Sequence, residues 1–145
     1  MISTKGRYAL RVLIDLAEHR SEKPVPLKDV AERQEISKKY LEIIVKELVH
    51  GGFVSGVSGK GGGYRLNKSP EDINVGEVLE LMEGTLASVI CLNKEEPYNC
   101  PRKPICKTLP MWEEFDQMVH DFFYSRTLQD LVGEDASLAG DLYVI

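Results

Sequence analysis

Residues 36–52, ISKKYLEIIVKELVHGG, decide the fold of this 145-residue chain. Ser37 is a preferred N-cap residue, and the Gly51-Gly52 pair that ends the stretch is a common stop signal for a helix. Between these two points, apolar residues recur at the i, i+3, i+4, i+7 spacing that gives a helix one buried face. These residues are Leu41, Ile44, Val45 and Leu48. The stretch therefore predicts an amphipathic helix.

Two further helices are predicted before this one. Residues 3–19, STKGRYALRVLIDLAEH, place their apolar side chains mostly on one helical stripe, and Ser3 or Thr4 is available as the N-cap. The two prolines of residues 23–26, KPVP, end that element and start the next one, LKDVAERQ at residues 27–34. Because only a short turn at residues 34–36 separates this helix from Ser37, the two helices form a helix-turn-helix pair.

The residues that follow predict a β-hairpin. Residues 53–57 and 64–66 alternate as short strands on either side of SGKGGG, residues 58–63, a glycine-rich turn that carries one cation, Lys60. Helix, helix, turn, helix and hairpin follow one another in the order of a winged helix-turn-helix. We therefore predict a mainly α-helical fold with a small β-hairpin wing.

The second half of the chain predicts more helix and one long loop. Asn74 is the N-cap of a fourth helix, VGEVLELMEG, that Gly84 ends. Residues 86–109 hold three prolines and show little periodicity, so they form a loop. Pro110 then opens a long helix, MWEEFDQMVHDFFYS, with a broad apolar stripe, and Thr127 with Asp130 caps a shorter helix.

These elements divide the chain into four parts. Residues 1–84 form the winged helix-turn-helix domain with its supporting helix, residues 85–109 the cysteine-containing loop, residues 110–132 the long helix with the short helix after it, and residues 133–145 a flexible tail. The apolar stripe of the long helix is wider than packing on its own domain requires, so we expect it to form a dimer seam.

Composition and charge restrict the function. The chain is 43% hydrophobic and 28% charged, which indicates a globular protein and excludes a disordered one. No stretch approaches the ~20 apolar residues of a membrane span, and the start lacks the apolar core of a signal peptide, so we expect a cytoplasmic protein with no membrane partner. Residues 1–70 carry 13 Lys and Arg against 8 Asp and Glu, whereas residues 71–145 carry 5 against 15. Such asymmetry is typical of a phosphate-facing module joined to an acidic one.

DNA binding is the chemistry that a winged helix-turn-helix predicts. Its third helix lies in the major groove, with hydroxyls and cations at the N-terminal end. A cation between glycines at the tip of the wing suits a phosphate or the minor groove. The candidate DNA-binding residues are Ser37, Lys38, Lys39, Tyr40, Glu42 and Lys60, of which Glu42 is placed to accept from a cytosine amino group.

The cysteines form a second candidate site. Cys91, Cys100 and Cys106 lie within sixteen positions, and no cysteine occurs elsewhere. An odd number of clustered thiols in a reducing compartment favours metal ligation over disulfides, and soft thiolates select iron–sulfur clusters or zinc. The other interpretation is that Cys91 is a small core residue and the other two are incidental.

The ordered set of motifs resembles the Rrf2 family of bacterial transcriptional regulators. It includes STKGRYALR from Ser3, ISKKYLEIIVKELVHGGFV from Ile36, SGKGGGYRL from Ser58 and INVGEVLELMEG from Ile73, so the resemblance covers nearly the whole chain. It implies a homodimer that joins through the long helix and binds pseudo-palindromic double-stranded promoter DNA. It further implies that the three cysteines hold an iron–sulfur cluster, with [2Fe–2S] favoured over [4Fe–4S].

The chain departs from the family pattern around this site. The gap between Cys91 and Cys100 is longer than usual, which a loop tolerates at little cost in closure entropy. Leu109 stands where some members have a histidine ligand, and Arg7 where others have a carboxylate that reaches the partner's cluster. The fourth ligand therefore stays open among an external thiol, a water and four carboxylates: Glu95, Glu96, Glu113 and Glu114.

Two other classes of function remain as alternatives. One is a zinc-binding or cluster-free member that responds to a protein or small-molecule partner. The other, an enzyme, is disfavoured because the sequence shows no constellation of nucleophile, base and oxyanion donors, and Ser58–Gly63 lacks the ending of a phosphate-binding loop.

Overall fold

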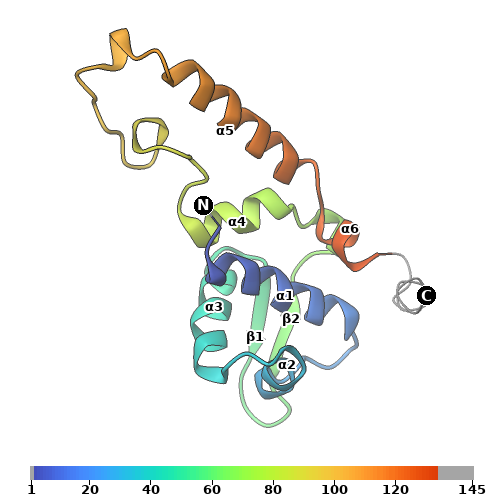
Figure 1. The fold of residues 1–145 in the computed structure, drawn as a ribbon. Coiled ribbons are helices and arrows are strands. Elements are labelled where there is room, and N and C mark those ends of the chain that lie inside the picture. The colour runs from blue at the N-terminus through green and yellow to red at the C-terminus, as the bar shows by residue number, and fades with distance from the viewer. Residues whose placement is uncertain (1, 134–145) are drawn as a thin grey trace.

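The computed structural model describes residues 2–133, and its elements follow the predicted order (Figure 1). The helices are α1 (Thr4–Glu18), α2 (Leu27–Gln34), α3 (Lys38–His50), α4 (Val75–Glu83), α5 (Leu109–Tyr124) and α6 (Leu128–Val132). The strands are β1 (Val54–Val57) and β2 (Gly63–Leu66), and short 3-10 turns occupy Pro70–Asp72, Ile90–Leu92 and Lys103–Ile105. The fold class is therefore confirmed as mainly helical with a two-stranded antiparallel hairpin.

The first and third helices begin at the predicted N-cap residues. The Ser3 hydroxyl accepts from the amide of Gly6 and caps α1, and the Ser37 hydroxyl accepts from the amide of Tyr40 and caps α3. Between α2 and α3 the chain turns through Glu35, whose φ of 54° places a non-glycine residue in the left-handed region. This turn directs α3 across the face of α1 and α2.

The wing is tied to the start of α2. In the antiparallel pair, Val54 lies opposite Leu66 and Val57 opposite Gly63. On the other edge of β2, Tyr64 and Val25 exchange two backbone hydrogen bonds of 2.8 Å. A Cβ atom on Gly63 would lie 2.2 Å from the Val25 carbonyl oxygen, so this close approach requires glycine. The hairpin is therefore held beside the helix-turn-helix pair.

A hydrophobic core holds the elements of the winged-helix domain together. It is built from the inward faces of α1 to α4, from β1 and from Leu128 of α6. Ala9, Val12 and Leu13 of α1 are fully buried at its centre. The predicted inward residues of α4 are also buried: Val78 and Met82 in this core, and Val75 and Leu79 in a second cluster with Leu86, against which Phe123 and Tyr124 of α5 pack.

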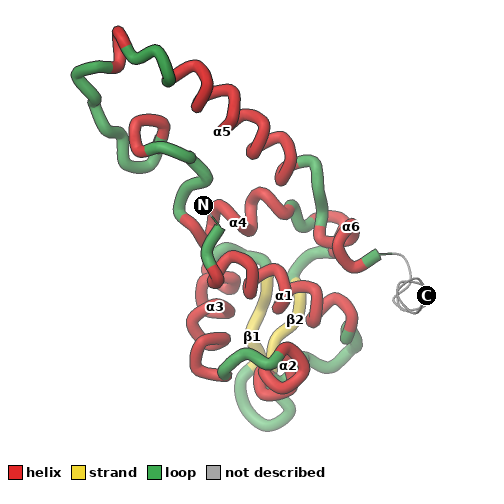
Figure 2. Tube along the Cα trace, viewed as in Figure 1, coloured by secondary structure: helices red, strands yellow, loops and turns green. Residues whose placement is uncertain are grey.

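The long helix leaves this body. Figures 1 and 2 show α5 leading away from the core, with the cysteine loop at its far end and α4 at its base. The base is closely packed, because Gly76 of α4 lies directly against the ring of Tyr124. Leu109 is the one residue of α5 that is buried.

Two details differ from the sequence prediction. The long helix begins at Leu109 and not at Pro110, because a proline in the first helical turn gives up an amide that has no helical partner there. The segment predicted as loop contains two 3-10 turns, each closed by local backbone hydrogen bonds. The helix capped by Thr127 and Asp130 is confirmed as α6, with a reciprocal capping box. The predicted flexible tail lies outside the described residues apart from Gly133.

Candidate functional site

The N-terminal end of α3 is the first candidate site. Lys38 and Lys39 are exposed there, directly after the Ser37 cap. The Ser37 hydroxyl oxygen accepts from the Tyr40 amide at 3.1 Å, so it already has a structural role as a cap. The ammonium groups of both lysines are free to meet phosphates in front of the helix.

Tyr40 and Glu42 face different surroundings. The ring of Tyr40 is half-buried and packs edge-on against Tyr8, with ring centroids 5.9 Å apart. Glu42 is exposed and lines a cavity of about 440 Å³ between α3, the start of α2 and the wing. The structure therefore turns Glu42 toward the wing and Tyr40 toward α1.

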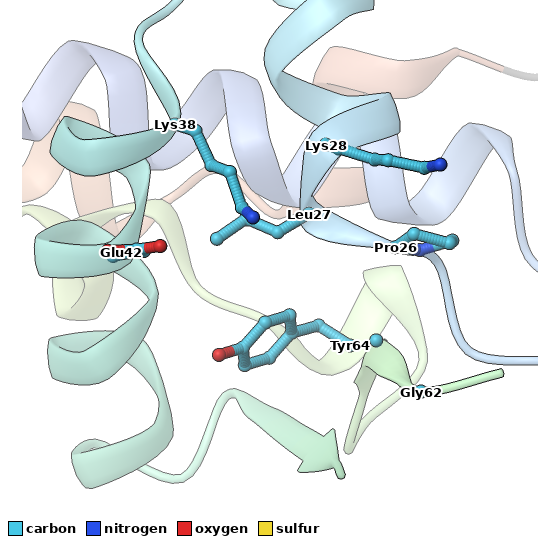
Figure 3. A pocket seen from close by; sticks show the side chains of 8 residues that line it. Pro26, Leu27, Lys28, Lys38, Glu42, Gly62 and Tyr64 are labelled. Atoms are coloured by element: carbon cyan, nitrogen blue, oxygen red, sulfur yellow. The ribbon is translucent and has the colours of Figure 1, made fainter. Parts of the chain in front are cut away.

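This cavity includes residues that the sequence pattern does not single out. Figure 3 shows Lys38, Glu42 and the Tyr64 hydroxyl converging on the space, while the Lys28 side chain extends along its outer edge. Lys28 lies beside α3 because α2 packs on α3, whereas Tyr64 of β2 is brought there by the pairing of Val25 with β2. The glycines around Tyr64 indicate only a turn, so nothing local in the sequence identifies this shared surface.

Lys60 lies on the turn between the two strands. Gly59 and Gly61 on either side of it have φ values of 89° and 79°, and the turn is exposed. Lys60 does not line the α3 cavity and stands apart from the helix residues, at the tip of the hairpin. The structure thus presents cations from two separate elements, α3 and the wing.

The cysteines lie along the loop between α4 and α5. Cys91 is in the Ile90–Leu92 turn, Cys106 directly follows the Lys103–Ile105 turn, and Cys100 lies between them. All three are half-buried free thiols. Within the part of the chain that the structure describes, no three His, Cys, Asp or Glu side chains converge as a metal site would require. The structure therefore keeps these thiols on one segment but does not bring them together.

The surroundings of Cys106 favour its thiolate form. The side-chain hydrogen bond with Thr108, whose Oγ1 lies 3.4 Å from the Cys106 Sγ, lowers the pKa of this thiol. Backbone amides of Thr108 and Leu109 and the charge of Arg102 act in the same direction. Thiolates ligate metals, so this shift favours ligation at Cys106.

A second cavity lies between the loop and α5. It has a volume of about 670 Å³ and is bounded by the end of α4, by the loop and by one side of α5. Glu95 and Glu113 line it, whereas Glu96 and Glu114 do not. Of the four carboxylates considered as a fourth ligand, only Glu95 and Glu113 therefore line the cavity beside the cysteine loop.

Much of the apolar stripe of α5 is exposed. Phe115 is 38% exposed and Met118 is 65% exposed, and Trp112 packs edge-on against Phe115 at 6.4 Å. Met111 and Phe122 are exposed on the same helix, while Val119 and Phe123 are half-buried. No helix within residues 2–133 is long and apolar enough to cross a membrane.

Comparison with known proteins identifies the family. The family model named Rrf2, described as an iron-dependent transcriptional regulator, matches residues 2–134. The chain is similar to the protein rrf2 of Nitratidesulfovibrio vulgaris, with 42% identity over 94% of this chain and 89% of that protein. It is also similar to the HTH-type transcriptional regulator IscR of Pectobacterium carotovorum, with 38% identity over 90% of this chain and 78% of that protein.

Solved structures agree with this match. CymR, the global cysteine regulator of B. subtilis, superposes with a TM-score of 0.72 and 34% identity, covering 91% of this chain and 95% of that chain. IscR of T. potens superposes with a TM-score of 0.69 and 34% identity, covering 91% and 85%. The chain therefore belongs to the Rrf2 family and is a DNA-binding transcriptional regulator, not an enzyme.

Proposed function

We propose that this regulator binds promoter DNA as a homodimer and that an iron–sulfur cluster held by Cys91, Cys100 and Cys106 controls the binding. One observation carries this proposal. The three thiols occupy the segment that joins α4, which packs on the winged-helix core, to α5, whose apolar stripe is partly exposed. A change in that segment acts on the placement of one winged domain relative to the other.

The DNA-binding part of the proposal rests on charge and shape. Lys38 and Lys39 at the start of α3 contact phosphates, and Glu42 accepts from a cytosine amino group in the major groove. Lys60 on the wing contacts a neighbouring phosphate or the minor groove. Ser37 and Tyr40 contribute through the helix cap and through the packing that holds the end of α3 in position.

The donor chemistry fits an iron–sulfur cluster. Three thiols on a loop without long helices match the soft ligands that such clusters take, and Glu95 and Glu113 share the adjacent cavity as candidate fourth ligands. By resemblance, a [2Fe–2S] cluster is favoured over [4Fe–4S]. When bound, it supplies a redox-active group that oxidants and nitric oxide can alter. The loop must fold around it, because the thiols do not converge without it.

The chain's own residues transmit the change. The loop begins where α4 ends at Gly84 and finishes at Leu109, the buried first residue of α5. A rearrangement of the loop therefore shifts α5 against α4. In a two-fold dimer on half-sites about 34 Å apart, a shift of a few ångströms misaligns one α3 helix with its groove.

A cluster-free or zinc-binding regulator is the second candidate. The specific observation in favour of the cluster-free form is that the three thiols are not gathered into a metal site among the described residues. A protein or small-molecule partner then takes the place of the cluster as the signal.

The first test concerns DNA binding. Lys38→Ala combined with Lys39→Ala removes two cations that face phosphates, so affinity is expected to fall for all duplex sequences. The slope of log K against log salt should flatten by roughly one for each lysine replaced. Fluorescence anisotropy across a salt series measures both quantities. Replacement of Lys107, a loop lysine outside this face, is the matched control. An unchanged slope in the double variant would show that α3 does not bind the phosphates.

The second test concerns the cluster. Protein purified without oxygen is expected to be coloured and to contain iron and acid-labile sulfide, both of which each Cys→Ala variant should reduce. Promoter binding is then compared with and without the cluster. A colourless anaerobic protein with stoichiometric zinc would favour the second candidate. Equal DNA binding by the two forms would remove the regulatory role.

A further inference from the structure

The outward face of α3 carries an exposed apolar side chain, that of Ile43, among the polar residues proposed to bind DNA. Ile43 is 51% exposed at the middle of the helix, while the next two residues, Ile44 and Val45, are buried in the core. Lys39 lies four residues before Ile43 and Lys46 three residues after it, and both are exposed. Residues at these spacings lie on one stripe of a helix, so Ile43 stands between two cations.

Exposure alone does not make Ile43 a site, because single apolar residues are common on protein surfaces. Its position between the two lysines is the informative point. When Lys39 and Lys46 meet phosphates at the edges of a major groove, the side chain between them faces the edges of the bases. An isoleucine side chain has no hydrogen-bonding group, so it recognises only an apolar feature there.

We propose that Ile43 reads a thymine in each half-site through contact with the thymine C5-methyl group. Of the groups that base pairs display in the major groove, this methyl group is the apolar one. Glu42 directly precedes Ile43 and is turned toward the wing. We therefore expect the two side chains to contact neighbouring base pairs of one half-site. This inference rests on the proposed entry of α3 into the major groove and adds the class of base that the helix prefers.

The test removes one methyl group from the DNA. Binding sites are first selected from a random duplex library with the wild-type protein. Each thymine of the selected site is then replaced by deoxyuridine, which lacks the methyl group and keeps every hydrogen-bonding group. Replacement of one particular thymine in each half-site is expected to lower wild-type affinity about fourfold, which corresponds to the burial free energy of one methyl group.

Variants of α3 assign the effect to a residue. Ile43→Ala should bind thymine and deoxyuridine duplexes equally, and Ile43→Val should keep most of the discrimination. Neither change should alter the salt slope, because Ile43 contacts no phosphate. The matched control is Val49→Ala, which shortens another exposed apolar side chain, 41% exposed, on the last turn of α3 and should leave the deoxyuridine effect unchanged.

The outcomes separate this inference from the proposed function. If the wild type binds a selected site and no thymine shows a deoxyuridine effect, or if Ile43→Ala keeps the full effect, Ile43 does not read thymine although α3 binds DNA. If no duplex is selected at all, the DNA-binding proposal itself fails, and this inference with it. A deoxyuridine effect that Ile43→Ala abolishes and Val49→Ala retains supports the assignment.

Discussion

At the scale of the residue, one buried charge organises the helix-turn-helix. Asp15 of α1 is 1% exposed, and within residues 2–133 no other charged side chain is buried. Arg33 donates two hydrogen bonds to its carboxylate, at 2.7 and 3.0 Å, and Gln34 donates a third at 3.0 Å. All three bonds come from the C-terminal end of α2, so Asp15 fixes the point where the turn toward α3 begins.

These hydrogen bonds lower the pKa of Asp15. Burial alone would raise the pKa, but the hydrogen bonds from Arg33 and Gln34 and the charge of Arg33 outweigh it, and the pKa lies below its ordinary value. A carboxyl group with a depressed pKa stabilises the fold fully above its unfolded pKa of about 3.9. This contribution is lost as the pH falls through the lower pKa of the folded state.

Removal of Arg33 is therefore expected to destabilise the protein. Arg33→Ala leaves a buried carboxylate short of two donors and should lower the free energy of unfolding by about 2–4 kcal/mol at pH 7. The difference from the wild type should shrink as the pH falls below about 4 and then through the lower folded-state pKa of Asp15, where the carboxyl group becomes protonated in the folded protein as well. Urea unfolding at several pH values measures it.

Glu32→Ala, a change at the exposed neighbour of Arg33, is the control and should stay within about 0.5 kcal/mol of the wild type. A pH-independent loss in Arg33→Ala would mean that Arg33 acts through packing and not through the Asp15 charge.

Residue-level prediction from the sequence succeeded where the signal was local. The caps at Ser3, Ser37, Asn74 and Thr127 are each confirmed by a side-chain hydrogen bond to a backbone amide within the first turn. The Asp15 network and the meeting of Tyr64 with α3 were not predicted, because each joins residues from separate elements and depends on how those elements pack.

At the scale of the element, the cysteine loop is attached to the middle of α5. The backbone amide of Ser88 donates to Oδ1 of Asp116 at 3.0 Å, across 28 residues. Ser88 lies three residues before Cys91, and Asp116 lines the cavity between the loop and α5. This hydrogen bond thus holds the first cysteine segment against the long helix.

Loss of this attachment should loosen the start of the loop. A hydrogen bond to a charged group contributes about 1.5–3 kcal/mol, so Asp116→Ala is expected to speed amide exchange of residues 86–92 by about tenfold or more. Asp116→Asn keeps an acceptor oxygen and should retain most of the protection. Hydrogen–deuterium exchange with mass spectrometry resolves this segment, and α2 peptides provide an internal control. Equal exchange in wild type and Asp116→Ala would show that the loop is held by other contacts.

The elements themselves were largely predictable. The apolar periods and cap residues gave α1 to α4, the hairpin and α6 at nearly their observed bounds. The loop was less predictable, because its two 3-10 turns are stabilised by local backbone bonds that leave no apolar period in the sequence. The spacing of the cysteines identified the segment but could not reveal that the thiols stay apart.

At the scale of the whole molecule, the basic winged domain and the acidic C-terminal half have separate tasks. We propose that the cations on α3 and the wing meet DNA. The long helix α5 extends from the domain (Figure 1), and several side chains of its apolar stripe, Met118 and Phe122 among them, are exposed. Monomeric soluble proteins rarely expose a large contiguous apolar patch to solvent. A second copy of the chain is the occupant we propose, because two-fold DNA sites require two α3 helices in fixed relation.

A charge in the stripe is expected to separate the two copies. Phe115→Asp places an unpaired carboxylate in a desolvated seam, and two such groups should raise the dimer dissociation constant by at least about a hundredfold. Phe115 is only partly buried in the single chain, so the variant should still fold. Its circular dichroism should match that of the wild type. Gln117→Glu adds the same charge on the side of α5 that lines the loop cavity, and it should remain dimeric.

Light scattering at micromolar concentration distinguishes the two masses. Wild type and Gln117→Glu should have the mass of two chains and Phe115→Asp that of one. Because one winged domain reaches only one half-site, the affinity of Phe115→Asp for a palindromic duplex should fall to its affinity for a half-site duplex. If the wild type has the mass of a single chain, a second copy does not cover the stripe. The proposed control of DNA binding would then fail too, because it requires two α3 helices whose spacing the loop can change.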